Sequence, residues 1–322
     1  MMSELKQKLG DVKENEPLAN HTTFKIGGPA KYFYLAKSSS DLMKAVYTAE
    51  RLGLQYFILG WGSNLLISDS GFDGLLIKAT SANLSVKGEE IFAEAGVNLS
   101  RLVGEAARSG LSGLEFAAGI PGTVGGAARN NAGAYGSSFG DLVCGLEVYQ
   151  DGKIKNLRHE DMQYHYRDSI LKHGNGIITS VKLKLKKGDQ VKVHQKVMEI
   201  IKQRVQRLPI EPSAGCFFKN VEVDDIKSGK ERIIKELNIT ESEWQEITKY
   251  GKLPVAFIFE KLGLKGKQIG GCKISEKHAA FFINSGGAKA EHVVMMVSDL
   301  KMRVRNQLGI QLQEEVQYIG FN

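Results

Sequence analysis

Apolar residues recur every three or four positions in several stretches, the spacing that places them on one face of an α-helix. In residues 39–52, Leu42, Val46 and Ala49 share such a face, with capping residues before it and Gly53 as a stop after it. The same reasoning predicts helices at residues 3–16, 39–52, 99–109, 191–207, 230–237, 254–263 and 290–308.

Between the helices, apolar and polar positions alternate, which predicts strands. The clearest case is 177–187, where Val181, Leu183 and Leu185 alternate with lysines, so that one face should be buried and the other exposed. Further strands are predicted at 31–36, 56–59, 65–68, within 75–95, and at 145–149, 153–157 and 315–319.

The chain has 322 residues, of which 42% are apolar and 25% charged, close to the average for folded soluble proteins. Its longest apolar runs are strand-sized, far short of the roughly 20 residues that span a bilayer, and the N-terminus lacks the apolar stretch of a signal peptide. Cys144, Cys216 and Cys272 form no CxxC, so neither a disulfide framework nor a zinc site is indicated. We expect a cytoplasmic protein without a membrane partner or a metal.

Length favours two domains at about 150 residues each, and Pro209 and Pro212 mark the predicted boundary between 1–208 and 209–322. The net charge of +7 is uneven, because residues 151–219 carry 15 basic and 7 acidic side chains, a difference of +8. Such a segment suits nucleic acid or an anionic small substrate. Aromatic residues make up only 8% and do not alternate with basic ones, which argues against an RNA-binding sheet.

Glycine is over-represented, with 36 residues, and six of them lie among the eighteen residues Gly119–Gly136. Two loops that contain glycine are candidates for a site, Gly60–Asn64 and Pro121–Gly126. The first loop is no dinucleotide-binding fingerprint, since Leu65 stands where the third glycine belongs and a strand follows. A phosphate loop of the Walker type is not predicted either. Its nearest match runs from Gly266 to Gly271 and is followed by Cys272, where the motif needs lysine. Each loop alone fits a tight turn, but together, with Asn130–Gly133 adjoining, they favour a pyrophosphate site built from backbone N–H groups.

Four further residues are candidates for chemistry, each with a structural alternative. Arg167, in Tyr-Arg-Asp-Ser, carries a permanent positive charge but could form a surface ion pair with Asp168. Cys216 follows a flexible Ala-Gly and precedes two phenylalanines. A thiol in such a place is more often buried and unreactive. His278, which precedes an apolar run, favours a structural role.

The fourth candidate comes from a pair of adjacent carboxylates, Glu314 and Glu315, which open a predicted strand. Successive side chains of a strand point to opposite faces, so only one of the two can face inward. Two exposed carboxylates are the structural alternative.

Taken together and in order, these segments resemble the UDP-N-acetylenolpyruvoylglucosamine reductase family. The resemblance extends over nearly the whole chain and also includes residues 20–30, 113–122, 263–266 and 315–320. It implies an α+β flavoprotein with a two-lobed FAD-binding domain of the vanillyl-alcohol-oxidase (PCMH) type, at 1–208 with lobes of about 1–80 and 81–208. A C-terminal α+β substrate-binding domain is implied at 209–322. The short stretch between Arg167 and Pro212 resembles the subtype that lacks an inserted substrate loop.

The family implies that NADPH reduces FAD and that reduced FAD then reduces the enolpyruvyl ether of UDP-N-acetylglucosamine to UDP-N-acetylmuramate for peptidoglycan. Ser63 stands where covalent relatives have histidine, so FAD should be bound non-covalently. By position, the implied FAD-binding residues are Gly60, Trp61, Gly62, Ser63, Asn64, Leu65, Pro121, Gly122, Thr123, Gly125, Gly126, Asn131 and Gly133. The implied substrate contacts are Tyr166, Lys219, Asn220 and Arg204.

The resemblance also implies catalytic roles. Arg167 and Glu315 match the pair that stabilises the enediolate, and Cys216 matches the proton donor. A permanent cation aimed at developing negative charge is electrostatic catalysis, whereas Glu315 helps if it is protonated, which requires a raised pKa.

Two positions depart from the family pattern. Cys216 stands where serine is usual, and a thiol, with an ordinary pKa of about 8.5, is the stronger acid. The thiol of Cys216 can also lose its proton, and the resulting thiolate reacts with alkylating agents. Val221 follows Lys219-Asn220 where proline is common, which predicts only a local change in the loop.

Two other readings remain open. One keeps the fold and FAD but makes the protein a flavin-dependent sugar or alcohol oxidase, which leaves Arg167, Cys216 and Glu315 without a role. The other is a non-enzymatic basic protein that binds nucleotides or RNA. We expect a monomer that acts on a small molecule and binds no nucleic acid.

Overall fold

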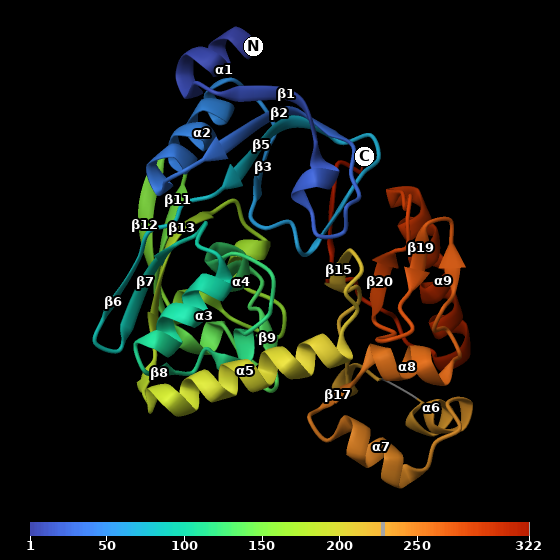
Figure 1. The fold of residues 1–322 in the computed structure, drawn as a ribbon. Coiled ribbons are helices and arrows are strands. Elements are labelled where there is room, and N and C mark those ends of the chain that lie inside the picture. Colours follow the sequence, from blue (N-terminus) through green and yellow to red (C-terminus); the bar gives the residue numbers. More distant parts are fainter. Residues whose placement is uncertain (227–228, 322) are drawn as a thin grey trace. The chain divides into compact units, whose positions relative to one another are not determined.

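The computed structural model describes residues 1–226 and 229–321, and the chain forms two compact units (Figure 1). The first unit consists of Met1–Glu16, Ala30–Gly62 and Phe72–Gln206. The second unit consists of Pro17–Pro29, Ser63–Gly71 and Arg207–Asn322. The chain therefore passes repeatedly from one unit to the other before its C-terminal third begins.

One sheet of the first unit has the strand order β1-β2-β5-β3. Its strands are β1 (Val12–Pro17), β2 (Pro29–Ala36), β3 (Tyr56–Leu59) and β5 (Phe72–Ala79), and β5 runs parallel to both β2 and β3. Helices α1 (Met2–Leu9) and α2 (Ser39–Arg51) bury Leu5 and Val46 in the same cluster as Leu75.

The prediction of a single helix at 3–16 was wrong. Helix α1 ends at Leu9 because Gly10 takes a φ of 86°, and the chain continues as strand β1. Helix α2 agrees with its prediction, although its cap is Ser38, whose hydroxyl accepts a hydrogen bond from the N–H of Asp41.

The other sheet of the first unit is antiparallel, in the order β12-β11-β13-β7-β6. Its strands are β6 (Leu84–Lys87), β7 (Glu90–Glu94), β11 (Val143–Gln150), β12 (Lys153–Arg158) and β13 (Ile177–Lys184). Along β13 and the residues after it, buried Val181, Leu183 and Leu185 alternate with exposed lysines, which confirms the predicted half-exposed strand.

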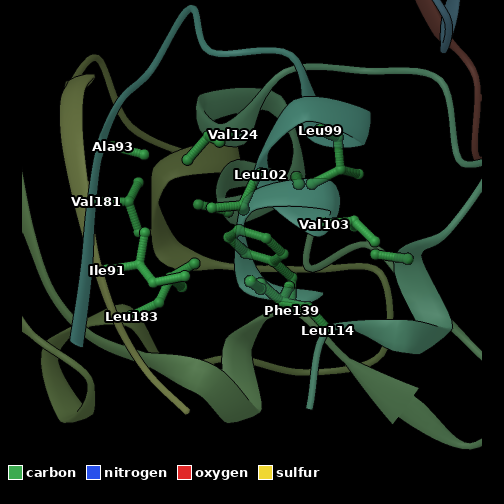
Figure 2. Close-up of a cluster of buried hydrophobic side chains, with 14 of the residues drawn as sticks. Ile91, Ala93, Leu99, Leu102, Val103, Leu114, Val124, Phe139, Val181 and Leu183 are labelled. Carbon is green, nitrogen blue, oxygen red and sulfur yellow. The ribbon is translucent and has the colours of Figure 1, made fainter. Parts of the chain in front are cut away.

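Three helices bury their apolar residues with this sheet: α3 (Leu99–Arg108), α4 (Val124–Arg129) and α5 (Gln190–Arg207). In Figure 2, Leu102 of α3 and Val124 of α4 lie against Val181, with the ring of Phe139 nearby. Short strands complete the unit: β8 (Leu111–Ser112), β9 (Gly133–Ala134), β10 (Ser137–Ser138) and β14 (Lys186–Lys187).

The second unit is built on an antiparallel sheet of order β15-β20-β19-β18. Its strands are β15 (Ser213–Cys216), β18 (Gln268–Ile269), β19 (Cys272–Ile274) and β20 (Phe281–Asn284). The helices are α6 (Lys230–Glu236), α7 (Glu241–Thr248), α8 (Val255–Lys261) and α9 (Ala290–Leu308). Two smaller pairs join β16 (Val221–Glu222) to β17 (Lys252–Leu253) and β4 (Leu65–Ile67) to β21 (Gln317–Ile319).

The division near Gln206 lies beside the predicted boundary at 208, but residues 17–29 and 63–71 belong to the second unit and not to the first. Packing and pairing explain this difference. Phe24 and Leu66 are buried in the apolar cluster of the second unit, and β4 pairs in parallel with β21, about 250 residues later along the chain.

The α+β class predicted for the chain is confirmed. Within the residues that the model describes, no helix is both long and apolar enough to cross a membrane.

Candidate functional site

The two glycine loops meet within the first unit. Gly60 follows β3, and a Cβ atom added to it would lie 2.7 Å from Oγ1 of Thr123, so a side chain at position 60 would displace the second loop. Trp61 is 48% exposed beside this contact. The absence of a side chain at position 60 thus permits the close approach of the two loops.

The second loop uses several of its own N–H groups inside the protein. The N–H of Val124 donates to the carbonyl of Val97 and that of Gly125 to Ala95, both at 2.9 Å, while Gly126 donates to Oγ1 of Thr123 at 3.2 Å. These three N–H groups are therefore used inside the protein.

The tip of this loop is what fits an anion. In residues 1–226 and 229–321, the N–H groups of Gly122 and Thr123 have no acceptor. A pair of neighbouring N–H donors at a glycine is the arrangement that binds phosphate oxygens without a lysine. The loop therefore fits the pyrophosphate of FAD through its tip, while Gly125, whose added Cβ would lie 2.7 Å from that of Ala95, serves packing.

Asn131 and Gly133, which the resemblance assigns to FAD, contact the loop that carries Arg167. The buried Asn131 amide donates to the carbonyl of His165 at 2.8 Å and accepts from the N–H of Gly140 at 2.9 Å. The carbonyl of Gly133 accepts a 2.6 Å hydrogen bond from Nη2 of Arg167. Both residues thus hold the segment that carries the candidate arginine.

Arg167 has a φ of 55°, a left-handed conformation that costs energy outside glycine and collects at functional sites. The Lys172 ammonium donates to the Arg167 carbonyl at 2.8 Å, and the Ser169 hydroxyl donates to the carbonyl of Arg129 at 2.6 Å. The guanidinium lies over the ring of Tyr166, 5.2 Å from its centroid. These contacts support the strained backbone and aim the side chain.

Asp168 makes its ion pair elsewhere. Both carboxylate oxygens lie 2.9 Å from Nε2 of His173, and this contact holds the pKa of Asp168 below its ordinary value despite partial burial, which acts the other way. The alternative reading of Arg167 as a surface partner of Asp168 is thus not what the loop shows.

In the second unit, Cys216 ends β15 opposite Phe281 of β20. Gly215 before it has a φ of 82°, and the two phenylalanines after it are buried, with Phe217 stacked on Phe282 at 4.6 Å between ring centroids. The thiol itself is only half-buried, so it lies at the margin of the aromatic cluster and differs from the enclosed, inert cysteine of the alternative reading.

The structure pairs the Glu315 main chain with Phe217, the residue after this cysteine. The N–H of Glu315 donates to the carbonyl of Phe217 at 2.9 Å, and Glu314 forms a bridge with Phe218. The carboxylate of Glu314 accepts from the Lys301 ammonium at 3.0 and 3.2 Å. The carboxylate of Glu314 is therefore held in an ion pair with a lysine of α9.

The predicted substrate contacts fall in both units. Lys219 is half-buried and has no carboxylate partner within the described part of the chain, while the side-chain oxygen of Asn220 accepts from the N–H of Val255 at the start of α8. Arg204, on α5 of the first unit, packs over Gly119 just before the second glycine loop. Val221 pairs with Leu253 in β16–β17, in keeping with a local change of the loop.

His278 has the structural environment that its sequence context favoured. Its Nδ1 accepts from the N–H of Ala280 at 3.3 Å, and its ring contacts Phe281 edge-on at 5.0 Å. Burial lowers the pKa of His278, and the Glu260 carboxylate opposes this more weakly. The ring is therefore held neutral.

Two supporting residues went unnoticed in the sequence. Lys172 stands five positions after Arg167, a spacing without a recognised motif. Asp69, in the loop after β4, accepts hydrogen bonds from the N–H groups of Ala290 and Glu291 at 2.8 and 3.0 Å, at the start of α9. Only the folded chain brings these residues to the groups that they hold, so no local signal indicated them.

The class of protein is that of the FAD-dependent oxidoreductases with an added C-terminal α+β domain. Family comparison agrees at each end of the chain. Residues 30–158 match the model of an FAD-binding domain. Residues 203–319 match the C-terminal domain of UDP-N-acetylenolpyruvoylglucosamine reductase.

Full-length relatives complete the identification. The chain is 35% identical to UDP-N-acetylenolpyruvoylglucosamine reductase of Bacillus subtilis, with 100% of this chain and 99% of that protein covered. It is 34% identical to the reductase of Syntrophomonas wolfei, with 96% and 95% covered. The crystal structure of the Thermus caldophilus reductase superposes with a TM-score of 0.73 at 30% identity, covering 96% of this chain and 98% of that one. The chain belongs to the UDP-N-acetylenolpyruvoylglucosamine reductase family, and it is an FAD-dependent oxidoreductase.

Proposed function

We propose that the protein uses NADPH to reduce the enolpyruvyl ether of UDP-N-acetylglucosamine enolpyruvate to UDP-N-acetylmuramate, a step of peptidoglycan precursor synthesis. Similarity to curated reductases over the full length of the chain supports this reaction. The observation that carries the assignment of residues is the hydrogen bond from Glu315 to Phe217, the neighbour of Cys216.

Bound FAD would supply the hydride chemistry, a transfer from NADPH to the methylene carbon of the substrate. In the residue assignment that we propose, residues 60–63 and the tip of the Pro121–Gly126 loop bind the FAD pyrophosphate. Hydride addition leaves an electron pair on the neighbouring carbon, which spreads into the carboxylate as an enediolate. The permanent charge of Arg167 stabilises this developing negative charge.

Cys216 then donates its thiol proton to that carbon, which completes the lactyl ether, and the thiolate regains a proton from solvent. Glu315 in its protonated form donates a hydrogen bond to the enediolate. An ionised Glu315 has no proton to donate, so this hydrogen bond is then absent. Lys219, Asn220, Arg204 and Tyr166 are the proposed substrate contacts. Lysine and arginine suit them because NADPH and the UDP-sugar are both polyanionic.

Two additions under anaerobic conditions test the reaction. NADPH should bleach the visible flavin absorbance of the purified protein, and the enolpyruvyl ether should restore it. Recovery only after air is admitted would support the sugar or alcohol oxidase instead. A purified protein that contains no flavin and takes up no added FAD would support the non-enzymatic nucleotide- or RNA-binding protein instead.

We also propose that the enzyme acts as a cytoplasmic monomer. Light scattering on the eluate of a size-exclusion column should give a mass near 35.4 kDa. A mass twice as large would contradict this part of the proposal without affecting the reaction.

A further inference from the structure

The Gly60–Asn64 loop is expected to bind FAD along its whole length, but its last residue makes different contacts. The side-chain amide of Asn64 donates to the carbonyl of Glu315 at 3.1 Å. The main-chain carbonyl of Asn64 accepts from the N–H of Gln317 at 3.0 Å. Asn64, Glu315 and Gln317 all belong to the second unit.

Glu315 is thereby held through both of its main-chain polar groups. Its N–H donates to the carbonyl of Phe217, beside Cys216, and its carbonyl accepts from Asn64. These are hydrogen bonds to two different segments of the chain, one at Phe217 and one at Asn64. The two hydrogen bonds fix the position of the Glu315 main chain and therefore the position from which its side chain extends.

The identity of the residue at this point depends on register. A slip of one residue in a strand sends every side chain to the opposite face, so it would exchange Glu315 for Glu314. In the observed register Glu314 lies in its ion pair with Lys301 of α9. The Asn64 amide is the side-chain contact that ties the Glu315 main chain to the end of the glycine loop.

We propose that Asn64 is a positioning residue that locks the register of residues 314–317, so that Glu315 and not Glu314 faces the substrate. The proposal rests on the role given to Glu315 above. It places the function of Asn64 in the second half-reaction, whereas an FAD ligand would affect cofactor retention and the first.

The two half-reactions separate these roles. In anaerobic stopped-flow experiments, Asn64→Ala should reoxidise with the enolpyruvyl ether about 10- to 100-fold more slowly than the wild type, the scale of a small misplacement in an active site. FAD content and the rate of flavin reduction by NADPH should match the wild type. Asn64→Asp, which keeps the shape and loses the donor, should show the same pattern.

A double-mutant cycle tests whether Asn64 acts through Glu315. In a Glu315→Gln background, Asn64→Ala should add little further loss, because coupled residues are not additive. Fully additive losses would overturn the proposal. Arg232→Ala is the matched control, since it removes side-chain hydrogen bonds to the carbonyls of Asn306 and Gln307 in the same unit, and it should leave reoxidation unchanged.

Other outcomes also decide the matter. Loss of FAD from both Asn64 variants, or slower reduction by NADPH, would overturn the proposal in favour of a cofactor ligand, and wild-type reoxidation rates in both would overturn it as well. A wild-type protein that the enolpyruvyl ether does not reoxidise would instead refute the proposed function, independently of the variants.

Discussion

Among single residues, the three cysteines differ in their capacity to react. Burial raises the pKa of Cys272 to about 12 and also raises that of Cys144. Because the thiolate is the form that alkylates, both should react slowly at pH 8, where little of either is ionised. Iodoacetamide should therefore label Cys216 first, and activity should fall as that label appears.

Mass spectrometry of digests taken during inactivation checks this order, and the substrate should protect Cys216. Cys144→Ser, the control, should be inactivated at the wild-type rate. If Cys216 is the proton donor, Cys216→Ser should remain active and lose the alkaline fall in activity that the thiol causes. An unchanged alkaline limb, together with a fully active Cys216→Ala, would contradict the assignment.

The left-handed backbone of Arg167 predicts a role for Lys172, whose ammonium donates to the Arg167 carbonyl. Lys172→Met should lower kcat/KM about 10- to 100-fold, since small displacements of an aligned group have effects of this size. Lys182→Met, which removes an exposed ion pair with Glu90 of the same unit, should have almost no effect. Equal activity of the two variants in steady-state assays would show that the Arg167 loop holds its shape without Lys172.

His278 predicts how stability depends on pH. Since burial lowers its pKa in the folded protein, the unfolded chain binds more protons as the pH falls through the ordinary value of 6.5, and the free energy of unfolding should decrease below that pH. Urea unfolding at pH 8 and pH 5.5 measures the difference. His278→Phe should lose about 1 kcal/mol at pH 8, because the Ala280 N–H loses its acceptor, yet show a smaller acid-side decrease. An unchanged decrease would mean that other groups cause it.

At the level of helices and strands, long periodic segments could be predicted and short ones could not. Helices α5 and α9 and strand β13 lie where periodicity placed them, because each buries one face against a large cluster. Helix α7 has eight residues and was missed, although Thr240 and Glu243 form a capping box at its start. Strand β1 was taken for helix because its polar residues carry no clear alternation.

Helix α9 illustrates an element that depends on a distant residue. The Asp69 carboxylate accepts from the first two N–H groups of the helix, where a negative charge is also favoured by the helix dipole. Asp69→Ala should lower the free energy of unfolding by about 1 kcal/mol, whereas Asp69→Asn, which keeps an acceptor, should lose less. Chemical denaturation compares them, and equal losses in both variants would assign the effect to charge alone.

Over the whole molecule, the sequence indicated two domains, but it did not indicate how the chain is divided between them. The parallel pairing of β4 with β21 joins segments some 250 residues apart, and the burial of Phe24 with the C-terminal helices has no local sign. The same limit applies to Asn64, which lies in a motif typical of cofactor loops while its amide binds Glu315.

This division predicts that the C-terminal third cannot fold alone. A fragment of residues 207–322 lacks β4, the partner of β21, and lacks Phe24 and Leu66 of its core. Alone it should show no cooperative thermal transition by circular dichroism. Coexpressed with residues 1–206, which carry both missing segments, it should copurify and melt cooperatively, because the cut lies between units and leaves each sheet intact. A fragment 207–322 that unfolds cooperatively without its partner would show that residues 17–29 and 63–71 cover that unit without being needed to build it.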